Sequence, residues 1–220
     1  MSKANKKLVI FDFDGTLVDT IIDAGRCFNK ALECFGFRTY PVEQYGQIVG
    51  GNLDVIFSRL LDKQHQTEEN LSKLKAKYRE IYASDEKPNT RPFDGILSVL
   101  ERLTQAGVSI AINTNKSQVL VDDLCAKVFP TVKFVAVCGY SDGVPSKPDP
   151  YAVNEIMKAC NVNKGETVYV GDGLTDVKTA QNAGVDCILV TWGQGDVEEI
   201  LNENPALFVA NEPSEILKFL

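Results

Sequence analysis

The sequence predicts an α/β protein, in which a parallel Rossmann-like sheet core carries an inserted small α-helical domain. Three observations support this prediction. A short apolar run near the start, Leu8–Phe11, ends in acidic residues. From Phe93 onward, apolar strand-like runs alternate with helical patterns. Between residues 18 and 88 there is no convincing buried strand.

The first strand is the most informative part of the chain. Its apolar residues are followed at once by Asp12, Phe13 and Asp14, and then by Gly15. Apolar runs of this length, bounded by a turn signal, are typical of strands buried in a parallel sheet. Ligands collect beyond the carboxyl ends of such strands. Two neighbouring acids there repel each other and favour a cation or a shared proton.

The helical block follows directly. Asp19 and Thr20 are residues typical of helix starts, and Ile21–Phe35 carries apolar residues at helical spacing. Charged residues over 68–79 indicate a solvated helix face. The polar segment Ser84–Pro92 is typical of a linker. We therefore expect a core domain of residues 1–17 and 89–220 and a helical domain of residues 18–88.

The remainder of the chain alternates strands and helices, which indicates a parallel sheet covered on both faces. The expected strands are 108–113, 134–138, 168–170, 187–190 and, more weakly, 207–209. The expected helices are 96–106, 118–127, 151–159 and 176–183, with a final helix after the last strand. The first strand must join this sheet, because it is too apolar to stand alone.

Composition excludes several classes of function. The chain has 220 residues and a formal net charge of -7, which argues against nucleic acid as a partner. No apolar stretch approaches the ~18 residues that span a membrane. Six cysteines occur without a Cys-x-x-Cys pair, which favours reduced thiols in a cytoplasmic protein. We expect a monomer or weak dimer that acts on a small molecule.

Polar residues gather where the predicted strands end. Asp12 and Asp14 follow the first strand, and Thr114, Asn115, Lys116 and Ser117 follow the second. The fourth strand runs into Gly171-Asp172-Gly173-Leu174-Thr175-Asp176, and Lys147 lies between the third and fourth, before Pro148. The carboxyl ends of parallel strands share one edge of a sheet, so these residues can converge.

This arrangement resembles the phosphatase branch of the haloacid dehalogenase superfamily. The resemblance rests on four motifs in order: Asp12-Phe-Asp14-Gly-Thr16, Thr114-Asn115, Lys147-Pro148-Asp149-Pro150 and Gly171-Asp172-x-x-x-Asp176. Each lies at a predicted strand end or loop. The resemblance covers the whole α/β part and implies a magnesium-dependent phosphatase with a small helical cap domain.

The residues suit that chemistry. A carboxylate can attack a phosphoryl group and carry it as an aspartyl-phosphate, and Asp12, last on its strand, suits this role. Asp14 can then serve as general acid and later as general base. Lys147 supplies positive charge beside the nucleophile. Thr114 and the backbone N–H of Asn115 can hold phosphate oxygens at a helix start, and Gly15 lets the backbone approach the phosphate.

A hard divalent cation offsets the repulsion between an anionic nucleophile and a phosphate. Asp12 and Asp172 are the expected side-chain ligands of Mg²⁺. The resemblance adds the backbone carbonyl of Asp14 and places Asp176 at the metal or just behind it.

The same residues bear on which member of the superfamily this is. Asp14 argues against dehalogenases and ion-pumping ATPases, and the helical insert resembles that of phosphoglycolate phosphatases. Substrate choice is expected from polar residues of the insert: Asp23, Arg26, Arg38, Gln44, Tyr45 and Asn52. One alternative is a sugar phosphomutase, although such mutases carry a histidine where Ala24 stands here. Another is a non-catalytic protein that binds phosphorylated ligands.

Overall fold

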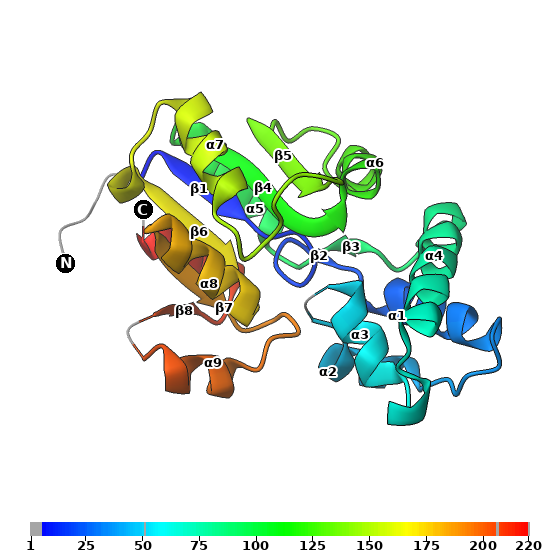
Figure 1. The fold of residues 1–220 in the computed structure, drawn as a ribbon. Helices are drawn as coiled ribbons and strands as arrows, with labels where there is room; N and C mark the ends of the chain where they lie inside the picture. Colours follow the sequence, from blue (N-terminus) through cyan, green and yellow to red (C-terminus); the bar gives the residue numbers. More distant parts are fainter. Residues whose placement is uncertain (1–5, 51, 206, 220) are drawn as a thin grey trace. The chain divides into compact units, whose positions relative to one another are not determined.

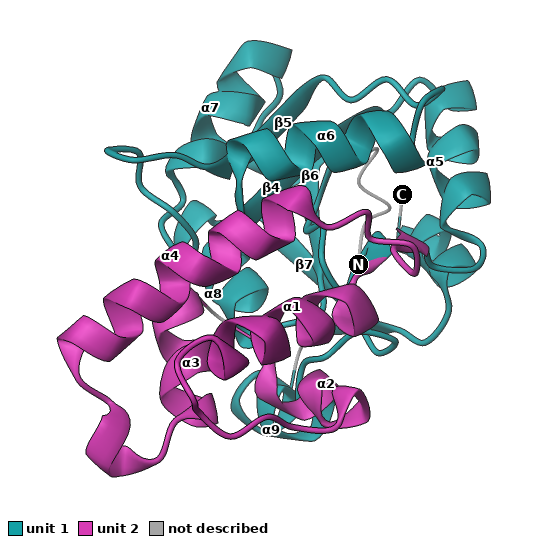
Figure 2. Ribbon diagram, turned by 90° about the vertical axis from the view of Figure 1, so that its right-hand side faces the viewer, with its two compact units in different colours: residues 1–18, 92–220 teal, residues 19–91 magenta. Residues whose placement is uncertain are grey.

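The chain folds as two compact units in a computed structural model, which describes residues 6–50, 52–205 and 207–219. Unit 1 comprises Met1–Val18 and Pro92–Leu220, and unit 2 comprises Asp19–Arg91. Figure 2 distinguishes them by colour. Among the described residues, no helix combines the length and apolar character needed to cross a lipid bilayer.

Unit 1 is built on a six-stranded sheet with the order β5-β4-β1-β6-β7-β8. Its strands are β1 (Leu8–Phe11), β4 (Ser109–Ser117), β5 (Ala136–Tyr140), β6 (Thr167–Gly171), β7 (Asp186–Val190) and β8 (Phe208–Ala210). Neighbouring strands of this sheet are parallel, and Leu8 is in register with Ser109 on one side and with Thr167 on the other. This is the order of a doubly wound α/β fold, which confirms the predicted fold class.

Helices cover both faces of this sheet. They are α5 (Ile96–Gln105), α6 (Gln118–Val128), α7 (Tyr151–Cys160), α8 (Leu174–Ala183) and α9 (Val197–Glu203), with 3-10 turns η3 (Lys164–Glu166) and η4 (Pro213–Phe219). Val9 and Phe11 of β1 pack into the core cluster shared with α5 and α6. Leu8 and Ile10 pack into the cluster shared with α7 and α8, which lie in front of the sheet in Figure 1. Alternate residues of a strand face opposite sides, so β1 is buried on both.

The expected strands and helices of unit 1 are confirmed to within a few residues, with one difference that matters. The second strand was expected to end at Asn113, but β4 continues to Ser117 with a register irregularity between these two residues. Helix α6 begins only at Gln118. The expectation that Thr114 and Asn115 stand at a helix start is therefore wrong, because both belong to the extended end of the strand. The final helix is the 3-10 segment η4.

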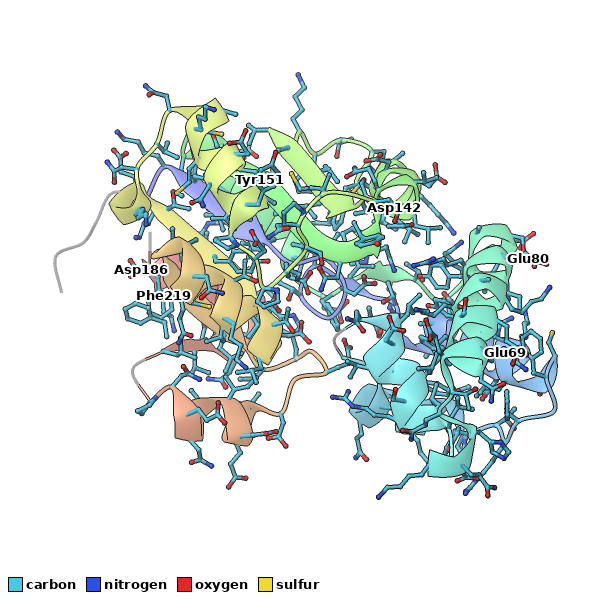
Figure 3. The ribbon with its side chains drawn as sticks, viewed as in Figure 1. Glu69, Glu80, Asp142, Tyr151, Asp186 and Phe219 are labelled. Carbon is cyan, nitrogen blue, oxygen red and sulfur yellow. The ribbon has the colours of Figure 1, made fainter. Side chains whose placement is uncertain are left out.

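Unit 2 is helical. It contains α1 (Ile21–Glu33), α2 (Tyr45–Ile48), α3 (Leu53–Leu60) and α4 (Glu68–Ser84), with 3-10 turns η1 (Val42–Gln44) and η2 (Lys63–His65). Its core is aromatic: Phe28 stacks on Tyr78 at 4.0 Å between ring centroids and meets Phe57 edge-on at 5.3 Å. On the charged face of α4, Glu69 and Glu80 extend away from the ribbon (Figure 3).

The segment before β3 (Arg91–Pro92) is more than a linker, because a buried carboxylate holds it to α1. Asp23 is 1% exposed. It accepts hydrogen bonds from the backbone N and Nδ2 of Asn89, at 2.9 and 2.8 Å, and from Oγ1 of Thr90 at 2.8 Å. Arg26 donates to it at 3.4 Å. These contacts, all within unit 2, give Asp23 a structural role. The short strand β2 (Val18–Asp19) pairs with β3.

Replacing Asp23 should destabilise the protein. Asp23→Asn removes the charge and replaces one acceptor oxygen by an NH₂ group, which cannot accept from Asn89 or Thr90. We therefore expect the free energy of unfolding to fall by about 2–4 kcal/mol. Urea unfolding followed by circular dichroism measures this. Asp62→Asn is the control: Asp62 is exposed and makes no side-chain cap bond, so its effect should stay within about 0.5 kcal/mol. Equal stability of the two variants would contradict this role for Asp23.

Candidate functional site

Three buried carboxylates meet at the carboxyl edge of the sheet. Asp12, Asp172 and Asp176 each offer one oxygen, and these oxygens lie within 4.8 Å of one another. Asp12 follows β1, Asp172 follows β6, and Asp176 lies in the first turn of α8. Because β1 and β6 are parallel neighbours, their ends place these acids side by side, as the sequence predicts.

Lys147 lies among these acids. Its Nζ is 2.7 Å from Asp12 Oδ1 and 2.7 Å from Asp176 Oδ1, and its side chain is 5% exposed. Burial alone would lower the pKa of Lys147, but Asp12 and Asp176 outweigh it and hold that pKa well above its usual value. Lys147 is therefore a fixed positive charge, which sequence reasoning expected beside Asp12.

Asp172 is held by donors on both of its oxygens. Oδ2 accepts from the backbone N of Gln194 at 2.8 Å, and Oδ1 accepts from Thr16 Oγ1 at 3.3 Å. Trp192 Nε1 donates in turn to the Thr16 carbonyl at 3.1 Å. Burial, followed by repulsion from Asp176, raises the pKa of Asp172 to about 6.

Gly15 is required by this packing. Its φ is +81°, in the left-handed region, and a Cβ there would stand 2.5 Å from Asp172 Oδ2. Any side chain would therefore strain the backbone and collide with the acid. Gly15 therefore brings the main chain against the carboxylate of Asp172.

Asp176 differs from Asp12 in how its oxygens are used. Oδ1 of Asp176 accepts from Lys147 and, at 3.4 Å, from the hydroxyl of Tyr169, while Oδ2 accepts from the backbone N of Gly173 at 3.0 Å. Oδ1 of Asp12 accepts from Lys147. In the described part of the chain, no donor is bonded to Asp12 Oδ2. The structure thus leaves one oxygen of Asp12 available to a ligand.

The charge balance of the cluster favours a divalent cation. Burial, then Asp176 and Asp172, raise the pKa of Asp12 well above its usual value, with Lys147 acting in the opposite direction. One ammonium group cannot balance three carboxylates in a buried space. Closely spaced carboxylate oxygens are the donor set that Mg²⁺ prefers, so these residues fit the expected metal.

The carboxylate of Asp14 lies outside this cluster. Its side chain is 29% exposed, and its Oδ1 is 3.0 Å from Nζ of Lys116, which is 10% exposed. The sequence places Lys116 in the polar run after the second strand but does not reveal this pairing, since the two residues are far apart in the chain. Asp14 therefore lies where solvent and a ligand can reach it.

Thr114 and Asn115 lie in the last part of β4, beside these groups. Thr114 is buried, and its Oγ1 accepts from the backbone N of Lys116 at 3.2 Å. Asn115 Nδ2 donates to the carbonyl of Lys147 at 3.2 Å. The side chain of Asn115 therefore helps to hold the segment that carries Lys147. The sequence predicts a role only for the backbone N–H of Asn115.

Several residues of the site are not predicted by any motif. Gln194 contributes its backbone N, which no side-chain pattern reveals, and the sequence assigned no role to Trp192. Only Tyr169 could have been suspected from the sequence, because its hydroxyl group stands between Val168 and Val170 in a buried strand.

The chain is similar to known proteins over nearly its full length. The family model of haloacid dehalogenase-like hydrolases matches residues 9–190. Phosphoglycolate phosphatase from Vibrio parahaemolyticus is 33% identical, over 99% of this chain and 97% of that protein. Phosphoglycolate phosphatase 1 from Pseudomonas aeruginosa is 32% identical, over 93% of this chain and 76% of that protein.

Solved structures share the fold. A haloacid dehalogenase-like family hydrolase from Streptococcus pneumoniae has a TM-score of 0.86 at 24% identity, covering 100% of this chain and 99% of that one. A predicted phosphatase from Clostridium acetobutylicum has a TM-score of 0.82 at 25% identity, covering 97% of each chain. The similarity therefore extends over the residues of both units.

The raised pKa of Asp172 predicts a pH-dependent effect on stability. A carboxyl with a pKa of about 6 in the fold and 3.8 otherwise binds its proton more tightly when folded, so its ionisation destabilises the fold above pH 6. The penalty shrinks as the pH falls below 6 and is lost below the unfolded-state pKa of 3.8. In chelator, Asp172→Asn should therefore raise the free energy of unfolding by about 3 kcal/mol at pH 7.5 and by only about 1 kcal/mol at pH 4.5.

Urea unfolding at the two pH values measures this difference. Asp94→Asn is the control, because Asp94 is exposed, and it should change stability little at either pH. An Asp172→Asn protein that is less stable than wild type at pH 7.5 would show that ionised Asp172 is a net stabilising group.

Proposed function

We propose, from the premise that this chain belongs to the haloacid dehalogenase-like hydrolase family, that it hydrolyses a small-molecule phosphate monoester with Mg²⁺ through an aspartyl-phosphate on Asp12. The chain is a phosphatase by its similarity to phosphatases over most of its length. The observation that carries the finer proposal is the Lys147–Asp12 pair, which leaves Oδ2 of Asp12 available beside two further buried acids.

Asp12 is the proposed nucleophile. Oδ2 attacks phosphorus, and the bond from phosphorus to the leaving oxygen breaks as that oxygen takes a proton from Asp14. Asp14 then accepts a proton from water, which attacks phosphorus and releases inorganic phosphate and the Asp12 carboxylate. The partial exposure of Asp14 suits a group that must meet both the leaving oxygen and water.

Positive charge makes this attack possible. Two like charges ~4 Å apart cost ~1 kcal/mol in water and ~4 kcal/mol at an effective dielectric constant near 20. Lys147 offsets part of this cost because it is buried against Asp12. Gly15, Thr114 and the backbone N–H of Asn115 are the proposed contacts to the phosphate oxygens.

Asp12 and Asp172, with the backbone carbonyl of Asp14, are the proposed ligands of Mg²⁺. When bound, the ion neutralises charge on the phosphoryl group and orients it. Asp176 already accepts from Lys147, Tyr169 and Gly173, so we assign it to holding Lys147 in place behind the ion.

Phosphoglycolate is the proposed substrate, because the two relatives are named as phosphoglycolate phosphatases. Unit 2 is the proposed helical cap domain that governs substrate choice. We also propose a cytoplasmic monomer or weak dimer. The six cysteines are free thiols, which supports a reducing compartment such as the cytoplasm. Burial raises the pKa of Cys27 to about 11 and that of Cys125 to about 12, so both remain protonated at neutral pH.

The purified protein should hydrolyse 2-phosphoglycolate and, less efficiently, p-nitrophenyl phosphate when Mg²⁺ is present. Chelator should abolish the activity and excess Mg²⁺ should restore it, because three buried acids with one lysine need a further cation. Phosphate release measures both. Turnover that is indifferent to chelator would remove the ion from this proposal, and no turnover of any phosphate ester with Mg²⁺ would refute the activity.

Asp12 and Asp14 should give different defects. Asp12→Asn should abolish turnover and take no label from a ³²P-labelled substrate, because the amide cannot attack. Asp14→Asn should lose roughly 10²–10⁴-fold in rate while still taking label on Asp12, because the second step stalls. Acid quenching and peptide mapping locate the label. Label on Asp12→Asn, or wild-type rates in Asp14→Asn, would overturn the corresponding role.

A further inference from the structure

Asn113 is a buried amide without a partner. The residue is 4% exposed, and its Nδ2 has no hydrogen-bond partner among the described residues. Leaving such a group unpaired gives up its hydrogen bonds to water without replacement, and buried polar groups in native proteins are rarely left unpaired. An apolar residue would fit the strand better, so the amide calls for a functional explanation.

The register of the sheet places Asn113 beside Asp12. The pairing of β1 with β4 runs to Phe11 and Ile112, and the next residue on each strand is Asp12 and Asn113. Two residues earlier, Ile10 and Ala111 are in register and share one core cluster. Side chains alternate along a strand, so Asp12 and Asn113 belong to that same face of the sheet.

The backbone of Asn113 is held by the same network as the acids. Its carbonyl accepts from the hydroxyl of Tyr169 at 3.1 Å, and that hydroxyl is 3.4 Å from Asp176 Oδ1. Tyr169 is fully buried. The position of Asn113 is therefore fixed relative to the Lys147–Asp176 pair, while its side-chain donor is left unused.

We propose that Asn113 is a positioning residue, whose Nδ2 donates to the carboxylate of Asp12 when substrate is bound. Lys147 already holds Oδ1 of Asp12. A second donor would fix the plane of the carboxylate and aim Oδ2 at phosphorus, since small errors in the position of a reacting atom are costly in rate. This inference rests on the proposed role of Asp12 as nucleophile.

A buried water is the competing explanation. Oδ1 of Asn115 also has no partner among the described residues, and one water could accept from Asn113 Nδ2 and donate to Asn115 Oδ1. In that case Asn113 would serve packing alone, and its loss would not slow the chemical step. The two explanations therefore differ in their effect on kcat.

Asn113→Leu tests the proposal, because leucine has the same branching of heavy atoms as asparagine and has no donor. We expect kcat for p-nitrophenyl phosphate to fall by roughly 10- to 100-fold with KM within about threefold of wild type, while the thermal midpoint in chelator is unchanged or raised. Asn113→Asp keeps the shape and replaces the donor with an acceptor, so its kcat should fall at least as far. If the leucine variant does not fold, the kcat of Asn113→Asp tests the proposal in its place.

Thr179→Val is the matched control. Thr179 is fully buried and donates to the Thr175 carbonyl within α8, so its loss should lower stability and leave kcat unchanged. A kcat within twofold of wild type in Asn113→Leu would overturn the inference, as would a loss that vanishes when rates are corrected for folded protein. Wild-type protein that neither turns over substrate nor takes label on Asp12 would instead refute the proposed function.

Discussion

The salt bridge from Lys147 to Asp12 and Asp176 is the interaction on which the site depends. Its ammonium nitrogen lies 2.7 Å from an oxygen of each acid, and the three side chains are at most 10% exposed. Without Lys147, the buried acids would repel one another with no positive side chain to balance their charge. Removing one partner of a buried ion pair in this way strongly destabilises a fold. One lysine still leaves the cluster negative, and the proposed need for a divalent ion follows from that imbalance.

The fold supplies this cluster through a few constraints. The central place of β1 between β4 and β6 brings three strand ends to one edge, and each contributes a polar side chain. Gly15 allows the chain to turn against Asp172. This edge of the sheet lowers the stability of the fold. The raised pKa values of Asp12 and Asp172 mean that their charged forms are disfavoured there, and the buried side-chain NH₂ group of Asn113 has no partner among the described residues. Functional sites commonly break local rules in this way.

The sequence predicts much of this, for identifiable reasons. Asp12, Asp172, Asp176 and Lys147 could be placed together because parallel strands end at a shared edge. The residue at which β4 ends could not be predicted in the same way, because the irregularity after Asn113 belongs to the pairing of β4 with β5. Gln194 acts through its backbone, and the partners of Asp23 lie 66 and 67 residues away. Such contacts depend on tertiary packing, which local patterns do not encode.

The central claim is that the buried acids are completed by a divalent ion that Asp172 helps to hold. Calorimetric titration of the purified protein with Mg²⁺ tests this most directly. We predict one ion per chain, with proton release at pH 6 because the pKa of Asp172 is about 6, and loss of this binding in Asp172→Asn. Equal Mg²⁺ affinity in the wild type and in Asp172→Asn would contradict the claim.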